Sequence, residues 1–298
     1  MMMENEITIS TSVGKVNLLH FPPSKSINQK ILCIHGYCCD ARIFRYIGAK
    51  MSKHGYDVYA IDLFGHGKSD GPRGDPDFEE TIKSINEIID KICSSQSRVF
   101  LLGHSLGCTY VLWYIHTYRK NVDGIILMSP YLKIKGIKSS GGEAVPGFLR
   151  FLKLLLLRIV IPKHRVSAAK VVQNSILSTC ETQQIMKDPQ INYYYSYRYI
   201  IDVIGLKNSN PRKFANIDIP VLILHGKNDK NVFPEVSEGF FNMLESTKEK
   251  AIHMFDCDHW FYHSIFYNQQ DMRYKEHERL HVVDTIIEWL EKNLIDKV

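Results

Sequence analysis

Short apolar runs alternate with amphipathic stretches along most of this chain. Almost continuous apolar character, typical of strands buried on both faces of a parallel sheet, is found at residues 30–35, 99–102, 124–129 and 219–225. Further strands are expected at residues 6–10, 15–21, 56–61 and 251–255. Apolar residues at helical spacing predict helices at residues 43–54, 76–95, 234–246 and 276–294. The alternation predicts an α/β protein with a mostly parallel central sheet and helices on both of its faces.

The alternation stops between residues 130 and 216, where helices and loops are expected and no convincing strand is visible. We therefore expect a helical cap, or lid, inserted at residues 131–216, and a core made of residues 1–130 and 217–298. Ligands bind beyond the carboxyl ends of the strands in such sheets, and we place the insertion over these ends.

Length and composition fit one large globular domain that carries an insertion. The chain has 298 residues, 45% of them apolar, and its formal net charge of +5 is too small to indicate a nucleic-acid partner. Its seven cysteines include no C-x-x-C pair, which favours reduced thiols. No secretory signal is visible, and the most apolar stretch, residues 148–162, is too short and too charged to span a bilayer. We expect a soluble, cytoplasmic protein.

A G-H-S-L-G sequence at residues 103–107 lies between an expected strand and an expected helix. Strand, G-x-S-x-G, helix is the arrangement of a nucleophile elbow, in which a serine occupies a strained turn and its hydroxyl points out of the sheet. The flanking glycines remove Cβ atoms that would collide with neighbouring elements. We predict that Ser105 is a nucleophile.

A serine nucleophile needs a histidine base, and the base needs an acid that fixes its tautomer. Asp229 and His259 follow Ser105 in the order Ser, Asp, His, and each lies just past the end of an expected strand. Loops at the same edge of the sheet would bring both to Ser105, so we predict Asp229 as the acid and His259 as the base. Asp256, Asp258 and His263 are nearby alternative candidates for the acid or the base, and His263 is expected inside a following turn or helix.

An oxyanion intermediate needs two converging N–H donors. One is expected from Leu106, directly after the nucleophile, since the start of the following helix offers unpaired N–H groups and its positive dipole end. The other is expected from the loop after residues 30–35, where we choose Tyr37, with Cys38 as the second option.

Several motifs together resemble one known superfamily. They are His35-Gly36, D-x-x-G-H-G-x-S at residues 62–69, the elbow at residues 103–107, Gly226 with Asp229, and His259. The chain resembles the α/β-hydrolase superfamily, and within it the serine hydrolases similar to monoacylglycerol lipases and lysophospholipases. The resemblance covers residues from about 30 to 130 and from 219 onward, and leaves out the insertion. It implies the same nucleophile, acid, base and oxyanion donors.

The chain departs from the family's pattern at two positions. Cys108 stands where many relatives have glycine or alanine, and is expected to alter the packing behind the elbow. Tyr37 is bulkier than the small residue common there; since only its backbone donates, its ring is expected to narrow the acyl pocket.

Two further histidines lie close to the expected site. His66 is expected to hold its loop by hydrogen bonds rather than to act as a second base. His104 is expected to be a structural partner of the nucleophile rather than a proton carrier. We also place His104, Phe148 and Leu152 among the residues that contact substrate.

The first part of the insertion is basic and strongly apolar, with nine Lys or Arg and one acid, Glu143, between residues 131 and 170. One hypothesis is a lid that meets acyl chains and makes peripheral contact with an anionic lipid surface. The alternative is an ordinary cap helix whose leucines pack on the sheet. Five tyrosines between residues 193 and 199 either line a pocket or fill the contact between insertion and core.

These residues predict a serine hydrolase that cleaves carboxylic esters of acylglycerol, lysophospholipid-like or other small acyl esters through an acyl-enzyme, without a cofactor or metal. Alternatives are an acyltransferase or a small-ligand receptor on the same fold. A remote one is a zinc hydrolase, because His277 and His281 belong to an H-E-x-x-H sequence. Acyl length, head group and oligomeric state are left open.

Overall fold

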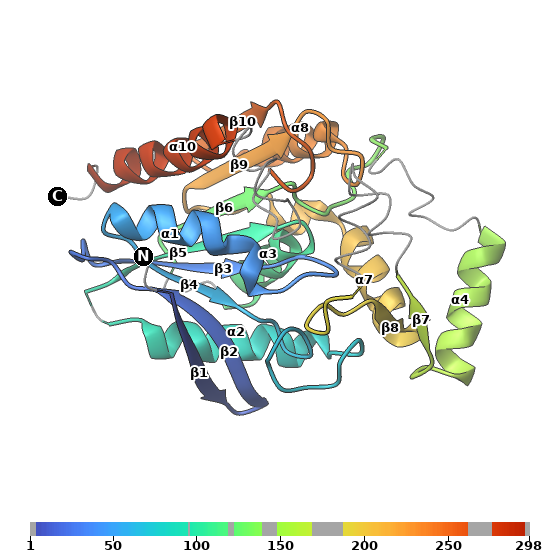
Figure 1. Cartoon of the computed structure of the whole chain (residues 1–298). Helices are drawn as coiled ribbons and strands as arrows, with labels where there is room; N and C mark the ends of the chain where they lie inside the picture. Colours follow the sequence, from blue (N-terminus) through green and yellow to red (C-terminus); the bar gives the residue numbers. More distant parts are fainter. Residues whose placement is uncertain are drawn as a thin grey trace.

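Eight strands form one twisted sheet in the part of the chain that the computed structural model describes, residues 4–94, 96–118, 122–138, 148–168, 187–261 and 276–295 (Figure 1). The spatial order is β1-β2-β4-β3-β5-β6-β9-β10. The pairs β1–β2 and β2–β4 are antiparallel and all later pairs are parallel. The strands are β1 Asn5–Thr11, β2 Gly14–Phe21, β3 Gln29–Ile34, β4 Asp57–Ile61, β5 Arg98–His104, β6 Gly124–Met128, β9 Val221–Gly226 and β10 Lys250–Phe255.

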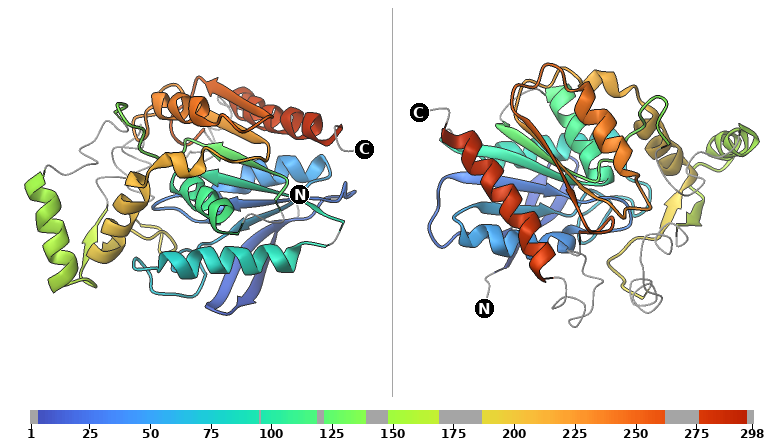
Figure 2. Two further views of the ribbon diagram at one scale, coloured as in Figure 1. Left: turned by 180° about the vertical axis from the view of Figure 1, so that it is seen from behind. Right: turned by 90° about the horizontal axis from the view of Figure 1, so that it is seen from above.

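Helices cover both faces of the sheet, as the alternation predicts. On one face lie α1 (Arg45–Lys53), preceded by a 3-10 turn at Ala41–Phe44, and α10 (Glu276–Ile295); on the other lie α2 (Phe78–Ile92), α3 (Leu106–Tyr118) and α8 (Pro234–Met243) (Figure 2). The fold class predicted from the sequence is confirmed, and helix and strand limits differ from the expected ones by a few residues.

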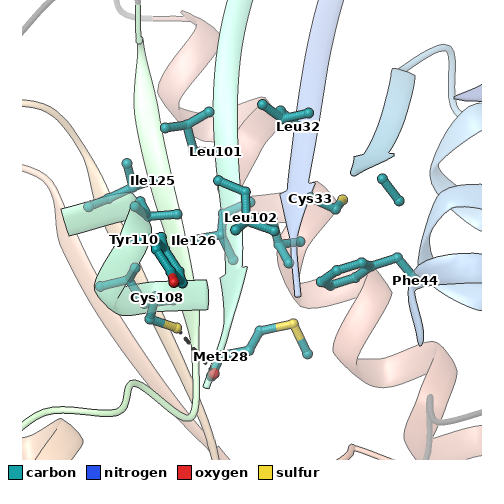
Figure 3. Close-up of a cluster of buried hydrophobic side chains, with 14 of the residues drawn as sticks. Leu32, Cys33, Phe44, Leu101, Leu102, Cys108, Tyr110, Ile125, Ile126 and Met128 are labelled. Atoms are coloured by element: carbon teal, nitrogen blue, oxygen red, sulfur yellow. Dashed lines mark hydrogen bonds between the residues drawn. The ribbon is translucent and has the colours of Figure 1, made fainter. Parts of the chain in front are cut away.

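The core lies where the central parallel strands meet these helices. Leu32, Leu101, Leu102, Ile125 and Ile126 of β3, β5 and β6 are fully buried beside Phe44 and Tyr110 (Figure 3). Strands that are apolar on both faces can be placed only inside a sheet covered on both sides, which fixes β3, β5 and β6 at its centre. The loop between β5 and α3 is therefore held by the most rigid part of the molecule.

The segment between β6 and β9 contains α4 (Phe148–Val160), β7 (Arg165–Ser167), β8 (Tyr194–Ser196), α7 (Tyr197–Asn208) and a 3-10 turn at Pro211–Phe214. β7 and β8 pair as an antiparallel two-stranded sheet, so the expectation of no strand between residues 130 and 216 is wrong. Strands of three residues are too short to show alternation in a sequence. α4 packs against α7 and projects away from the main sheet (Figure 1).

None of the helices in the described ranges combines the length and the apolar character that crossing a bilayer requires.

Asp57, at the start of β4, joins three adjacent strands. Its carboxylate accepts hydrogen bonds from His20 of β2 and Lys30 of β3, each at 2.6 Å, and from Tyr59 on its own strand at 2.9 Å. Burial by itself raises the pKa of Asp57, but the hydrogen bonds from His20 and Lys30 and the lysine charge outweigh it and lower the pKa to about 2.

We expect Asp57→Asn to lower the free energy of unfolding at neutral pH by about 1–2 kcal/mol. A carboxyl group whose pKa is depressed in the folded state stabilises the protein above its unfolded-state pKa of about 4, and this contribution is lost as pH falls toward 2. Urea unfolding between pH 7 and pH 3 should therefore show a shallower loss of stability for Asp57→Asn than for Asp218→Asn, an exposed control. Equal pH slopes for the two variants would contradict this role of Asp57.

Candidate active site

Ser105 lies in a sharp turn between β5 and α3. Its backbone is left-handed, with φ 54°, which is unusual for a residue with a side chain. The turn is held from three sides: Ser105 N–H donates to Met128 O of β6 at 2.8 Å, and Ser105 O accepts from the N–H groups of Cys108 at 3.0 Å and Tyr131 at 3.2 Å. This is the strained strand–helix turn that the elbow motif predicts.

Glycine is required around this turn because backbones approach one another closely. A Cβ added to Gly107 would lie 2.0 Å from Ile34 O of β3, and one added to Gly103 would lie 2.7 Å from the Cα of Cys108. A Cβ on Gly36, in the loop after β3, would lie 2.9 Å from the Cβ of Ser105 and equally close to His104 O. Gly36 therefore brings the loop after β3 directly against Ser105.

Cys108 fills the space behind the elbow. Its thiol is buried and lies 3.1 Å from Gly103 O and 3.3 Å from Met128 O (Figure 3). Its effect is on packing at the back of the turn, as expected from the sequence.

Asp229 and His259 meet beyond the ends of β9 and β10. His259 Nδ1 donates to Asp229 Oδ2 at 2.7 Å, and both side chains are almost fully buried. Asp229 Oδ1 accepts from the N–H groups of Asn231 at 2.8 Å and Val232 at 2.9 Å. The carboxylate thus orients the ring so that Nε2 of His259 is left as the basic nitrogen.

Burial by itself raises the pKa of Asp229, but attraction to His259 and hydrogen bonds from His225 and His259 outweigh it and hold the pKa well below its usual range. Asp229 therefore stays ionised at neutral pH. An ionised carboxylate is what stabilises an imidazolium formed beside it.

His225, the fifth residue of β9, is a partner of Asp229 to which sequence analysis assigns no role. Its Nε2 lies 3.2 Å from Asp229 Oδ2 and donates to Val232 O at 2.9 Å. Its Nδ1 then accepts from the Ser237 hydroxyl at 2.6 Å. The signal in the sequence is a histidine four positions before the acid, but spacing alone does not show that its ring turns inward.

His104 ties the histidine loop to the elbow. Its Nε2 donates to the backbone O of His259 at 2.9 Å, and the two rings lie 4.9 Å apart between centroids. Burial, followed by the proximity of His259, lowers the pKa of His104 to about 3, so its ring is neutral. His104 thus makes a structural bond to the His259 loop from the position next to Ser105; its role beside a nucleophile and its contact with substrate stay predictions.

No hydrogen bond between the Ser105 hydroxyl and the His259 ring is present among the described residues. The His104 bond nevertheless places the His259 backbone beside the residue that precedes Ser105. Contacts between a nucleophile and its base are often long without substrate and shorten in the complex.

The N–H groups of Tyr37 and Leu106 have no acceptor among the described residues. Leu106 is the first residue of α3, where N–H groups lack intrahelical partners. The N–H of Cys38 donates instead to the Tyr195 hydroxyl at 3.1 Å. This bond disfavours Cys38, our second option, and leaves Tyr37 and Leu106 as the candidate oxyanion donors.

The family model Hydrolase_4, described as serine aminopeptidase, S33, matches residues 25–270 of the chain. The chain belongs to this family. Its fold is that of the α/β-hydrolases: a soluble variant of monoglyceride lipase from Saccharomyces cerevisiae, in complex with a substrate analog, has a TM-score of 0.78 at 20% identity, over 98% of this chain and 97% of that one.

Two relatives differ in how much of their length the chain covers. A monoacylglycerol lipase of Mycolicibacterium smegmatis is 20% identical in an alignment of 298 positions that covers 95% of this chain and 95% of that protein. An uncharacterized abhydrolase domain-containing protein of Dictyostelium discoideum is 25% identical in an alignment of 280 positions that covers 89% of this chain. The chain spans only 26% of the length of this second relative.

The remaining candidate residues either have other hydrogen-bond partners, lie on the projecting α4, or fall outside the described residues. Asp256 accepts from Asn228 Nδ2 at 2.8 Å, and Asp258 accepts from Trp260 N–H at 3.0 Å, while His263 lies outside the described residues. Leu152 is 44% exposed on the projecting α4, and the side chain of Phe148 lies outside the described part. Their contact with substrate stays a prediction.

His277 and His281 are exposed on α10, whose apolar stripe faces the core. Among the described residues, no three His, Cys, Asp or Glu side chains are grouped so that they could hold a metal ion.

We expect Gly36→Ala to lower ester turnover roughly 100-fold, because a methyl group there must displace the Ser105 side chain or the His104 carbonyl. Initial rates with a soluble p-nitrophenyl ester would measure the loss, and circular dichroism would show that the variant folds. Gly205→Ala is the matched control, since a Cβ at Gly205 meets nothing within 4 Å. Comparable activity of the two variants would contradict the contact between this loop and Ser105.

Proposed function

We propose that the protein is a serine hydrolase that cleaves carboxylic esters through an acyl-enzyme formed on Ser105. The observation that carries the proposal is the buried Asp229–His259 hydrogen bond of 2.7 Å, bonded through His104 to the strained turn that holds Ser105. Order in the chain, position at the strand ends and ring orientation all fit the roles of nucleophile, acid and base.

In the proposed first half-reaction, Nε2 of His259 takes the Ser105 proton while Oγ attacks the ester carbonyl carbon. The carbonyl π electrons move onto its oxygen, which the N–H groups of Tyr37 and Leu106 stabilise. The tetrahedral intermediate then collapses: the bond to the alcohol oxygen breaks, and the imidazolium of His259 gives that oxygen its proton. Asp229 stabilises the imidazolium throughout.

In the second half-reaction, His259 takes a proton from a water molecule, whose oxygen attacks the acyl carbonyl and forms a second tetrahedral intermediate. When this intermediate collapses, the bond to Ser105 Oγ breaks, the carboxylic acid leaves, and the imidazolium of His259 gives its proton to Oγ, which restores the Ser105 hydroxyl. Transfer to another alcohol or amine would use the same intermediate, so the acyl acceptor is an experimental question. Profiling with p-nitrophenyl esters, monoacylglycerols and lysophospholipids, with glycerol added as a competing acceptor, would separate hydrolysis from transfer and fix acyl length and head group.

The substrate class we propose is a small acyl ester such as an acylglycerol or a lysophospholipid. Two of the comparisons are with monoacylglycerol or monoglyceride lipases. The Tyr37 ring stacks on Tyr195, with centroids 4.2 Å apart, next to the Tyr37 N–H that we propose as an oxyanion donor. Two aromatic rings here favour an acyl chain that is narrow near the carbonyl. A cytoplasmic location stays a prediction.

We also propose that residues 131–216 form a cap that makes peripheral contact with lipid surfaces. Six large apolar side chains at and just after α4 are exposed: Leu152, Leu155, Leu156, Ile159, Val160 and Ile161. The exposure of these six side chains favours the lipid contact over the alternative of an ordinary cap helix whose leucines pack on the sheet. Lys153, Lys163 and Arg165 are exposed nearby. Apolar side chains beside cations are typical of segments that bind anionic membrane surfaces.

We expect Ser105→Ala to lower kcat for ester hydrolysis by about 1,000-fold or more without unfolding the protein. The same variant should lose covalent labelling by a fluorophosphonate, which reacts with an activated serine. Ser129→Ala, at another buried serine after a strand, is the control for labelling. Near-native turnover by a folded Ser105→Ala protein would eliminate the proposed mechanism.

We expect the double variant Leu156→Glu, Ile159→Glu to bind anionic vesicles about tenfold more weakly than the native protein. The substitutions remove apolar area and add negative charges that the anionic lipids repel. Flotation with vesicles containing about one third phosphatidylglycerol measures this binding. Ile27→Glu is the control. It changes an exposed isoleucine outside residues 131–216 and should bind vesicles as the native protein does. Hydrolysis of a water-soluble ester should be unchanged, and equal vesicle binding by all three proteins would refute the lipid contact.

A further inference from the structure

The loop that carries the Tyr37 N–H contains a residue in an unfavourable conformation. Cys38 has φ 55°, in the left-handed region, although it is not glycine. Such a conformation is unfavourable for a residue with a Cβ, so surrounding contacts must hold it. Cys38 directly follows Tyr37. The peptide unit between them shares the Cα of Tyr37 with the preceding peptide unit, which carries the Tyr37 N–H, so holding one unit limits the rotation of the other.

The contact that holds this peptide unit comes from a residue 157 positions later in the chain. The N–H of Cys38 donates to the hydroxyl oxygen of Tyr195 at 3.1 Å. Tyr195 belongs to β8 and is completely buried. Its ring also stacks on the ring of Tyr37, so one side chain contacts two successive residues of the loop.

The Tyr195 hydroxyl has a partner for its own proton. His66 Nε2 lies 3.4 Å from this hydroxyl, and His66 Nδ1 lies 3.3 Å from the carbonyl of Phe64. A carbonyl only accepts, so Nδ1 carries the proton and Nε2 accepts from Tyr195. Burial, followed by repulsion from His35, lowers the pKa of His66 to about 3 and keeps the ring neutral. His66 holds its loop by hydrogen bonds, as the sequence predicts, and also fixes the direction of the Tyr195 hydroxyl.

Tyr195 is itself fixed to the core by the residues around it. Ser196 N–H donates to Gly74 O at 2.8 Å, and the Ser196 hydroxyl donates to Asp75. Arg73 donates to the backbone oxygens of Gly67 at 2.6 Å and Gln190 at 2.8 Å, joining the two segments. In addition, Arg42, which lies in the 3-10 turn after the Tyr37 loop, forms an ion pair of 2.8 Å with Asp188. Residues 188–196, which we call the return segment, are thus anchored beside the loop.

We propose that Tyr195 is a positioning residue for the oxyanion site: its hydroxyl holds the Tyr37–Cys38 peptide so that the Tyr37 N–H faces the oxygen of the reacting carbonyl. The inference rests on the proposed function. The same bond offsets the strain at Cys38, since without it a buried N–H would lose its partner and the loop could relax. When this bond is lost, the Tyr37 N–H no longer faces the oxygen of the reacting carbonyl, while the surface that binds the substrate changes little.

Tyr195→Phe tests the proposal because it removes one oxygen atom and keeps the ring. We expect kcat for a short p-nitrophenyl ester, calculated per active site titrated with a fluorophosphonate, to fall roughly 10- to 100-fold with KM nearly unchanged. A donor that acts on the oxyanion stabilises the transition state and has little effect on the binding of the substrate in its ground state. Tyr194→Phe, at a neighbouring tyrosine that is 58% exposed, should keep native kinetics.

A second measurement separates positioning from a loss of stability. An alkyl trifluoromethyl ketone adds to the serine and places an oxyanion in the site, so its affinity should fall by the same factor as kcat in Tyr195→Phe. The affinity for the matching fatty acid, which forms no oxyanion adduct, should stay within about twofold. Thermal unfolding of each variant records stability independently, and a purely structural role would lower Tm while leaving kcat per titrated site unchanged.

Cys38→Gly provides a rescue experiment, because glycine adopts a positive φ without strain. In the Cys38→Gly background, Tyr195→Phe should lower kcat several-fold less than in the native background. An undiminished loss there, or native kcat in Tyr195→Phe itself, would overturn the role of Tyr195. A native protein with neither ester turnover nor fluorophosphonate labelling would overturn the proposed function, and this inference with it.

Discussion

The left-handed backbone of Ser105 is the constraint on which the rest of the site depends. A residue with a side chain keeps this conformation only when its surroundings hold it. Here β6 accepts the Ser105 N–H, and Gly107 lets α3 approach β3 so closely that a methyl group would meet Ile34 O at 2.0 Å. Since these contacts come from the central strands of a buried sheet, the core that stabilises the protein also orients the Ser105 side chain.

A second constraint is the buried carboxylate of Asp229. Burial disfavours an ion, yet this one has two backbone N–H donors and two histidine neighbours, His225 and His259. Because its hydrogen bonds are satisfied, Asp229 stays charged in a region of low dielectric, where its effect on the His259 ring is stronger than it would be in water. His225 and Ser237 extend this arrangement into α8, so Asp229 is fixed by a helix as well as by its own turn.

The segment between β6 and β9 divides into two parts with different physical character. α4 presents apolar side chains to solvent beside cations and packs against α7. The return segment, by contrast, is tied to the core by arginines, a serine–aspartate hydrogen bond and the buried Tyr195. Lipid contact is our proposal for the first part, whereas the second part contacts the loop after β3 through Tyr195.

The sequence by itself determined the α/β architecture, because apolar runs and helical spacing record burial locally, and it determined the elbow, because only glycines admit the close contacts around Ser105. It also indicated Asp229 and His259, since parallel strands end at one edge. Only the tertiary structure decided that His225 faces Asp229, that His104 bonds to His259 O, and that the Tyr195 hydroxyl takes the N–H of Cys38. Which donor meets which acceptor across 157 residues depends on how elements pack, and no local spacing encodes it.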